Sequence, residues 1–368
     1  MDGTKNFKGW IRGGSEACPR LDSNYFVLGC TVGYDENTDL EYKIKIKVDE
    51  KIHVQEERLD RISYNDKGNR NTNIFTTKNI REYEGIIRAE YDDGKNDSNS
   101  VIECMGFSSV ISQLQTKIPL KSEIEKTIVS EIQYVIKRLR NILFFDPEPT
   151  SMEVYSRIND IEMKPNGSNL PSVLNHLCKE NEKKEKILDI MRSLPESEFI
   201  NIFFDRTSIG DVMFKVEEKV GENNYNIEAE KLSYGTLRAL AIVAALLQGD
   251  ERSMIIIEEV DNGIHPSRAS KLIDVISNVS DKRNIDTLIT THNMALLNAV
   301  NKENLVGVVD CYRNPSSGSS KFVSLVDIDK YPKLMATGKL GDLLEKDEVH
   351  KAIMNKKTRK NQYTWMEE

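Results

Sequence analysis

Alternation of apolar and polar residues predicts β-structure in the first part of the chain. Within 40–48, apolar residues alternate with charged ones, which is the period of a strand with one solvated face. Three more apolar stretches predict neighbouring strands of an antiparallel sheet, at 25–32, 51–59 and 85–91. Polar stretches rich in Asn, Asp and Gly, at 64–74 and 92–100, are expected to be loops.

A helical pattern replaces this alternation over residues 106–195. Ser122 and Glu125 form a capping-box pair that opens a long helix with one apolar stripe, and the residues at 144–151 break this helix. Two further helices are expected around 170–177 and 187–194. Because this block lies between two β-rich parts of the chain, we expect it to be an inserted lid or arm.

The remainder of the chain combines a hairpin with alternating helices and strands. Apolar residues alternate at 200–204 and at 212–216, as in two paired strands. Beyond them, predicted helices precede predicted strands in three pairs, 233–248 with 254–258, 266–279 with 286–291, and 293–300 with 305–311. Helix–strand alternation with short apolar strands is typical of a parallel α/β sheet.

Composition narrows the class of protein. The 368 residues suggest two domains or one large domain with an insertion. The net charge of −8 disfavours general nucleic-acid binding, although a local basic patch stays possible in principle. The longest apolar run, Ala239–Leu247, is far shorter than the roughly 20 residues of a membrane span, and the N-terminus lacks the pattern of a signal peptide. Five scattered cysteines indicate reduced thiols, so we expect a cytoplasmic protein.

Two carboxylates follow an apolar strand, and they are the first candidate for chemistry. Glu258 ends the predicted strand 254–258, and Glu259 follows it directly. A parallel strand delivers its last residues to the crevice where ligands bind, so that one carboxylate can hold Mg²⁺ and the next can polarise a water. Taken alone, the pair is equally compatible with a strand end that is merely solvated.

Three neighbouring segments supply groups suited to a phosphate. Ser233 and Gly235 open a helix, where a hydroxyl and free amides can bind an anion, although an ordinary helix cap is the simpler interpretation of these two alone. His292 follows a buried strand and can hydrogen-bond a phosphate or an attacking water. Asn262 and His265 lie in the turn between the carboxylates and the next helix.

Together, these segments resemble the motifs of the ABC-type ATPase superfamily. LSYGTLR at 232–238 resembles the signature, MIIIEEVDNGIHPSR at 254–268 the Walker B segment with the D-loop, and LITTH at 288–292 the H-loop. More narrowly, the chain is similar to the bacterial AAA_21/AAA_15 ATP-binding proteins, relatives of the OLD (overcoming lysogenization defect) and SMC-like ATPases. The segments that carry this similarity are WIRGGSE at 10–16, FFDPEPTSM at 144–152 and KPNGSNLPSVL at 164–174.

The resemblance implies a role for each candidate residue, with ATP and Mg²⁺ as cofactors. Glu258 would support Mg²⁺, although the family more often has Asp there; Glu259 would orient the hydrolytic water, and His292 would lie near the γ-phosphate. The residues at the dimer interface would be Ser233 and Gly235, which contact the γ-phosphate of a nucleotide held by the other protomer, and Asn262 and His265 of the D-loop. Gln55 is a candidate for the Q-loop.

The resemblance also implies the fold and its division into parts. It predicts an α/β, ABC-type ATPase head, in which an antiparallel β subdomain and a parallel α/β lobe carry an inserted helical subdomain. The expected parts are a β-rich region, a helical insert, a C-terminal ATPase lobe and a polar tail, at 1–105, 106–195, 196–354 and 355–368 respectively.

One motif of the family is missing from the sequence. The Walker A motif, GxxxxGK[ST], supplies the phosphate loop and its lysine, and no Gly-Lys-Ser or Gly-Lys-Thr occurs in the chain. We therefore expect the chain to begin beyond this motif, with Walker A supplied by a missing N-terminal segment or by another chain. This chain alone is expected to bind ATP poorly, and whether it hydrolyses ATP stays open.

Three functions remain open at this stage. The first is an ABC/SMC-like ATPase subunit that dimerises head to tail with ATP and switches a partner effector, such as a nuclease encoded nearby, in bacterial anti-phage defence. The second is a non-hydrolysing scaffold or regulatory subunit that keeps the ABC-like interface. The third is a DNA-clamping repair ATPase head, for which the basic clusters at 137–140 and 356–360 are the candidate contacts.

Overall fold

A computed structural model of the protein describes the central part of the chain with short gaps. The described residues are 18–19, 23–48, 52–65, 68–81, 85–94, 99–195, 198–301, 303–316, 318–328 and 331–354. The family-like segment at 10–16, the tail at 355–368 and its basic cluster lie outside the described residues. The chain divides into two compact units, Met1–Asn141 and Ile142–Glu368, and each is described by itself.

The first unit is built on a six-stranded antiparallel sheet in which each strand pairs with the next. Its strands are β1 (Tyr25–Asp35), β2 (Thr38–Val48), β3 (Ile52–Asn65), β4 (Gly68–Arg81), β5 (Ile86–Tyr91) and β6 (Ser100–Met105). The predicted antiparallel sheet is confirmed, but the predicted loop at 64–74 is wrong because Ser63 and Arg70 are paired across β3 and β4. Main-chain groups make a strand ladder, so polar side chains on a solvated face do not prevent it.

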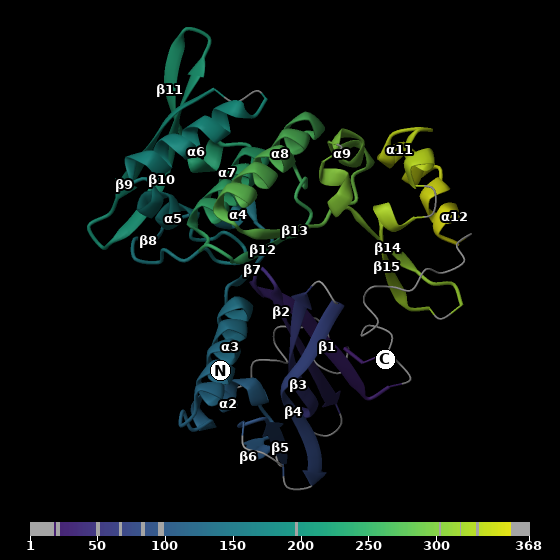
Figure 1. Ribbon diagram of the computed structural model, residues 1–368. Helices are drawn as coiled ribbons and strands as arrows, with labels where there is room; N and C mark the ends of the chain where they lie inside the picture. The colour runs from purple at the N-terminus through teal and green to yellow at the C-terminus, as the bar shows by residue number, and fades with distance from the viewer. Residues whose placement is uncertain are drawn as a thin grey trace. The chain divides into compact units, whose positions relative to one another are not determined.

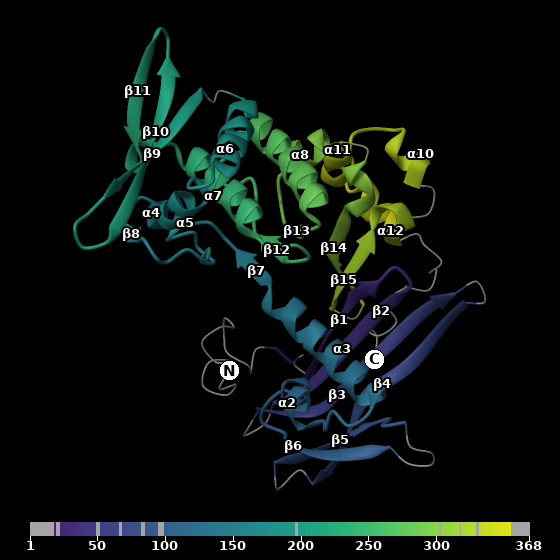
Figure 2. The ribbon, with the colours of Figure 1, turned by 60° about the vertical axis from the view of Figure 1, so that its left-hand side comes forward.

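Two helices, α2 (Val110–Lys117) and α3 (Glu123–Arg140), cover one face of this sheet, and the strand residues Leu40, Leu59 and Phe75 are buried in the same core as α3. Figure 2 shows α3 running alongside the strands. The capping box that opens α3 is confirmed, because the Ser122 hydroxyl accepts a hydrogen bond from the Glu125 amide and the Glu125 carboxylate accepts one from the Ser122 amide.

A three-stranded parallel sheet forms the centre of the second unit, in the order β13 (Asp286–Ile289), β12 (Met254–Ile257) and β7 (Ile142–Phe145). The predicted parallel α/β sheet is confirmed. The sequence does not predict β7: α3 ends at Arg140 instead of continuing to 143, since the next apolar residues pair with β12.

Two helices, α7 (Tyr234–Gln248) and α8 (Pro266–Arg283), lie side by side over one face of this sheet (Figure 1). The strand predicted at 305–311 is wrong in its bounds. A 3₁₀ turn, η4 (Asn304–Gly307), precedes β14 (Val309–Arg313), which pairs antiparallel with β15 (Ser320–Ser324).

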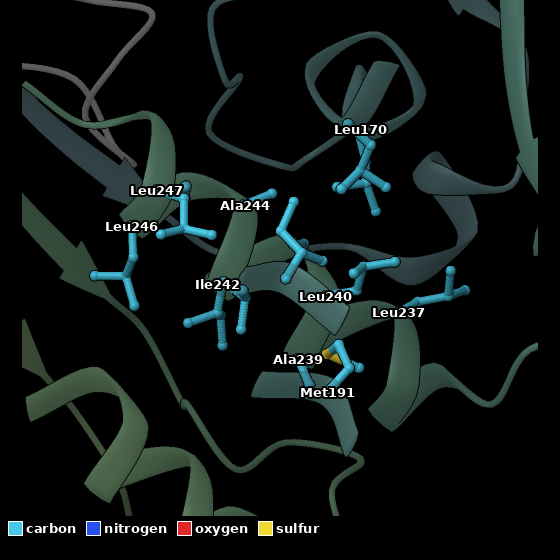
Figure 3. Packing of buried hydrophobic residues seen from close by; sticks show 14 of the residues in the cluster. Leu170, Met191, Leu237, Ala239, Leu240, Ile242, Ala244, Leu246 and Leu247 are labelled. Carbon is cyan, nitrogen blue, oxygen red and sulfur yellow. The ribbon is translucent and has the colours of Figure 1, made fainter. Parts of the chain in front are cut away.

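Helix α7 is buried continuously from Gly235 through Leu247. Figure 3 shows its leucines and alanines packed near Leu170 of α5 (Leu170–Leu177) and Met191 of α6 (Asn181–Ser193). A helix that is apolar all round needs neighbours on every side. This packing fixes α7, and with it the candidate signature residues at its N-terminus.

A small antiparallel sheet completes the second unit. It contains the confirmed hairpin of β9 (Phe199–Arg206) and β10 (Asp211–Val220), with Phe204 opposite Phe214, together with β8 (Ser156–Arg157) and β11 (Asn223–Glu228). The remaining helices are α4 (Pro149–Met152), α9 (Met294–Ala299), α10 (Tyr331–Met335), α11 (Leu340–Glu345) and α12 (Glu348–Met354), with 3₁₀ turns η3 (Ala229–Lys231) and η5 (Leu325–Asp327).

The boundary between the units falls within the range 106–195, so this range contributes α2 and α3 to the first unit and α4, α5 and α6 to the second. The four-part division expected from the sequence stays a prediction. Among the described residues, no helix is long and apolar enough to cross a membrane.

Candidate functional site

The candidate catalytic residues lie where the parallel strands end. Ile257 of β12 is in register with Phe145 of β7 and with Ile289 of β13, so the residues that follow these three positions meet at one edge of the sheet. The Glu258 amide donates to the Phe145 carbonyl at 3.1 Å, and the Thr290 amide donates to the Ile257 carbonyl at 3.0 Å. The strand ladder therefore continues one residue beyond β12 and presents Glu258 and Glu259, both exposed, at the open edge.

Glu259 has an unusual backbone. Its φ is +42°, in the left-handed region that residues other than glycine rarely adopt. Its amide donates to the Thr290 hydroxyl at 3.0 Å, and its carboxylate accepts a hydrogen bond of 3.4 Å from the Asn262 side-chain amide. Two of the expected site residues, Glu259 and Asn262, are thus in direct contact.

His292 is exposed and lies two residues beyond Thr290, on the segment that follows β13. The turn after the carboxylates is tied to this segment by two hydrogen bonds, from the Thr291 hydroxyl to Asp261 at 2.6 Å and from the Val260 amide to the Thr290 carbonyl at 3.2 Å. The structure therefore brings Glu258, Glu259 and the segment bearing His292 to adjacent strand ends.

The N-terminus of α7 contacts the same turn. Ser233 is the N-cap of α7, and its hydroxyl accepts a hydrogen bond from the Thr236 amide at 3.1 Å. Gly235 is buried, and a Cβ atom there would stand 2.8 Å from the Gly263 carbonyl oxygen and 3.4 Å from the Ile264 Cα. The candidate signature and D-loop segments are consequently packed backbone to backbone.

His265 and Arg268 fix the start of α8. His265 is the N-cap of α8, with its Nδ1 2.8 Å from the Ser267 hydroxyl, so its ring supports the helix start. Arg268 donates to the Pro195 carbonyl at 2.6 Å and to the Thr236 hydroxyl at 3.1 Å, which links α8 to α7. Burial raises the pKa of Glu218, and the charge of Arg268 opposes this increase.

A cleft of about 610 Å³ opens beside these residues, at the ends of β7 and β12. It is lined by Phe144, Phe145, Asp146, Pro147, Glu148, Pro149, Pro165, Asn166, Arg238, Glu258 and Asn262. Arg238, from α7, is only 4% exposed and donates from Nη2 to the Asp146 carboxylate at 2.9 Å and to the Glu258 carbonyl at 3.3 Å. The lining is acidic, because it contains the carboxylates of Asp146, Glu148 and Glu258 and one cation, Arg238.

These residues fit Mg²⁺ better than they fit phosphates. Among the described residues, no group of three or more His, Cys, Asp or Glu side chains is arranged to hold a metal. Mg²⁺ needs fewer protein ligands than such a group provides, because it keeps several waters and is held by one or two carboxylates together with substrate phosphates. Glu258 can supply such a carboxylate. A triphosphate also needs cations, and the one arginine in the cleft lining already bonds Asp146.

Sequence reasoning missed three groups of this site. Arg238 and Thr290 lie within the quoted motifs, but no pattern shows that both contact the peptide group between the two glutamates. Asp146 falls in the stretch predicted to break the helix, although its position after an apolar run, like that of Glu258, is a signal for a strand end. Gln55, the Q-loop candidate, lies in β3 of the first unit.

Comparison with known proteins identifies the family. Residues 108–298, just over half of the chain, match the model of AAA_21, described as an AAA domain and putative AbiEii toxin of a type IV toxin–antitoxin system. The chain belongs to the AAA_21 family. The match agrees with the ABC-type ATPase motifs in the sequence, and it identifies the matched residues as an AAA domain. No curated protein matches this AAA_21 chain.

Several solved SMC head domains are similar to the chain at low identity. The SMC head domain from Thermotoga maritima is 10% identical with a TM-score of 0.31, over 73% of this chain and 74% of that one. The Pyrococcus furiosus Smc head bound to the C-terminal domain of ScpA is 12% identical with a TM-score of 0.31, over 77% and 80% of the chains. An Smc head bound to the C-winged helix domain of ScpA is 12% identical with a TM-score of 0.36, over 73% and 74%. The family assignment rests on the AAA_21 match.

Proposed function

We propose that this chain is the hydrolytic half of an ATPase head. In this proposal Glu258 supports Mg²⁺, Glu259 orients the attacking water and His292 lies near the γ-phosphate. The observation that carries it is the convergence of Glu258, Glu259 and the Thr290–His292 segment at neighbouring ends of parallel strands. Ligands of open α/β sheets bind at that edge.

In this proposal a missing N-terminal segment or another chain would supply the phosphate loop, since the present sequence contains no Gly-Lys-Ser or Gly-Lys-Thr. Among the described residues, β13 pairs with β12 alone, so no described strand lies along its other edge. One face of the sheet is also poorly covered. Phe144 and Leu288, in register with Ile256 on that face, are 62% and 49% exposed.

Parallel sheets are normally covered on both faces, and a strand followed by a helix would satisfy both needs. A segment with the order strand, phosphate loop and helix adds a strand to β13, covers the apolar face and places its loop at the edge that carries Glu258. Its lysine would supply the positive charge that the acidic cleft lacks.

Association with a second copy follows from the same proposal. Ser233, exposed at the N-terminus of α7, and Gly235 would contact the γ-phosphate of a nucleotide held by the partner in a head-to-tail dimer, with Asn262 and His265 at the interface. The description of the matching family names a toxin–antitoxin system. We extend the proposal to bacterial defence against phage, in which ATP-driven dimerisation switches an effector protein such as a nuclease.

The test is to measure ATP hydrolysis in the chain alone and in the chain produced together with a strand–loop–helix segment carrying GxxxxGK[ST] from an AAA_21 relative. Hydrolysis should appear only in the combination. Glu259→Gln should lower kcat about 10²- to 10⁴-fold, the usual contribution of a general base, and leave nucleotide binding in place. Undiminished hydrolysis by Glu259→Gln would refute the assigned role. Absence of both binding and hydrolysis in the combination would favour a non-hydrolysing scaffold.

A further inference from the structure

One peptide group in the site is held at both of its ends. It is the group between Glu258 and Glu259. Its carbonyl oxygen, on Glu258, accepts a hydrogen bond of 3.3 Å from Arg238, and its amide, on Glu259, donates one of 3.0 Å to the Thr290 hydroxyl. The two partners come from different elements, α7 and the segment after β13.

The residue that follows this peptide group is strained. Glu259 adopts the left-handed conformation. For a residue with a side chain, the population of this conformation is about five- to thirtyfold lower than that of the right-handed one. Such a conformation persists only where surrounding contacts impose it. The two hydrogen bonds define the plane of the peptide that precedes Glu259, and they are therefore suited to impose it.

Packing alone does not explain a buried arginine beside the Glu258–Glu259 peptide group, because burying its charge costs stability. Its side chain is almost fully buried, and its Nε has no hydrogen-bond partner among the described residues. Nη2 makes both the bond to Asp146 and the bond to the Glu258 carbonyl. A buried cation costs stability unless its contacts compensate. Asp146, the residue directly after β7, anchors the guanidinium, so the clamp spans the ends of β7, β12 and β13.

We propose that Arg238 and Thr290 are positioning residues that clamp the Glu258–Glu259 peptide group and hold Glu259 in the left-handed conformation, with Asp146 anchoring Arg238. This inference rests on the proposed function, because the geometry matters to catalysis if Glu259 orients the water. The clamp directs the Glu259 carboxylate to the end of the sheet without any direct bond between the clamp residues and that carboxylate.

A substitution pair at position 259 reports the clamp without any need for hydrolysis. Where the backbone is right-handed, replacing glycine by alanine lowers the equilibrium constant for unfolding about two- to fivefold. Where it is left-handed, glycine is the more stabilising residue. We expect Glu259→Gly to be more stable than Glu259→Ala in the otherwise unchanged chain. In a Thr290→Val background, which keeps the shape and removes the hydroxyl, the order should reverse or the difference should vanish.

Two controls keep this test decisive. Thr290→Ser retains the hydroxyl and should preserve the glycine preference. Arg238→Lys keeps the charge on a shorter group and should weaken that preference, but the Thr290 comparison decides the outcome if Arg238→Lys does not fold. The proposal is overturned if Glu259→Ala is the more stable variant in the unchanged chain, or if Thr290→Val leaves the glycine preference intact.

Kinetics test the catalytic consequence in the hydrolysing combination described above. Thr290→Val should lower kcat at least about tenfold with little change in KM, because it misplaces a group used in the transition state, and Thr290→Ser should restore kcat. Normal kcat in Thr290→Val would overturn the positioning role. If the combination shows no hydrolysis, the proposed function fails, while the stability order at position 259 still judges the clamp.

Discussion

Replacing Gly235 by alanine should destabilise the second unit, against the usual trend for helices. Gly235 lies in the first turn of α7. Within a helix, glycine is about 1 kcal/mol less favourable than alanine, so propensity alone predicts a gain in stability. Here the new Cβ would stand 2.8 Å from the Gly263 carbonyl oxygen, and both the oxygen and the nearby Ile264 Cα are backbone atoms.

The magnitude follows from these opposing terms. Backbone cannot rotate away as a flexible side chain can, so α7 and the turn at 262–264 must separate by a few tenths of an ångström. Overpacking of this kind costs about 1–3 kcal/mol, which outweighs the propensity gain. We expect Gly235→Ala to lower the free energy of unfolding by up to about 2 kcal/mol.

The assay is urea unfolding followed by circular dichroism, with hydrogen exchange of α7 peptides to localise the loss to the second unit. Gly307→Ala is the matched control, since a Cβ there meets no atom of the described residues within 4 Å and φ is not positive. Its effect should stay within about 0.5 kcal/mol. A Gly235→Ala variant that is more stable than the unchanged chain would show that α7 and the turn are not in close contact.

Three further predictions concern the same fold. Asn169→Ala should destabilise the second unit by about 2–4 kcal/mol, measured by urea unfolding, because the buried side chain bonds three main-chain groups of the 160–164 loop. Ser122→Ala should cost about 1 kcal/mol and increase amide exchange in the first turn of α3, whereas Ser130→Ala on its exposed face should not. Burial raises the pKa of Glu218 in the folded state. The stability that Glu218 contributes is therefore fully present below its pKa in the unfolded chain, and it is lost as the pH rises through its pKa in the folded chain. Glu218→Gln should remove this pH dependence from the free energy of unfolding.

The parts of the fold that follow from periodicity were predictable. The alternation in β2 and the apolar strand before Glu258 specify their elements locally, since one face or both faces must be buried. Strand β7 could not be separated from α3 in this way. Its four residues continue the apolar stripe of the helix, and only pairing with β12, more than 100 residues later, makes them a strand.

The candidate site likewise has residues that local sequence patterns reveal and contacts that depend on distant segments. Glu258, Glu259 and His292 can be named as candidates from the sequence because each follows an apolar strand. The contacts that shape the site depend on distant segments: Arg238 bonds a carbonyl 20 residues away and Thr290 an amide 31 residues away. The left-handed backbone of Glu259 was equally hidden, since nothing in a glutamate's side chain favours it.

One edge of β13 has no neighbouring strand among the described residues, and this affects how much of the protein a cell can maintain. An exposed strand edge flanked by an apolar residue such as Leu288 is a template for aggregation. A chain made in excess of the segment that pairs with β13 would be removed by proteases or lost to aggregates. If, under the proposed function, another chain supplies this segment, the two polypeptides must be synthesised in matched amounts, and the level of this chain should rise and fall with its partner.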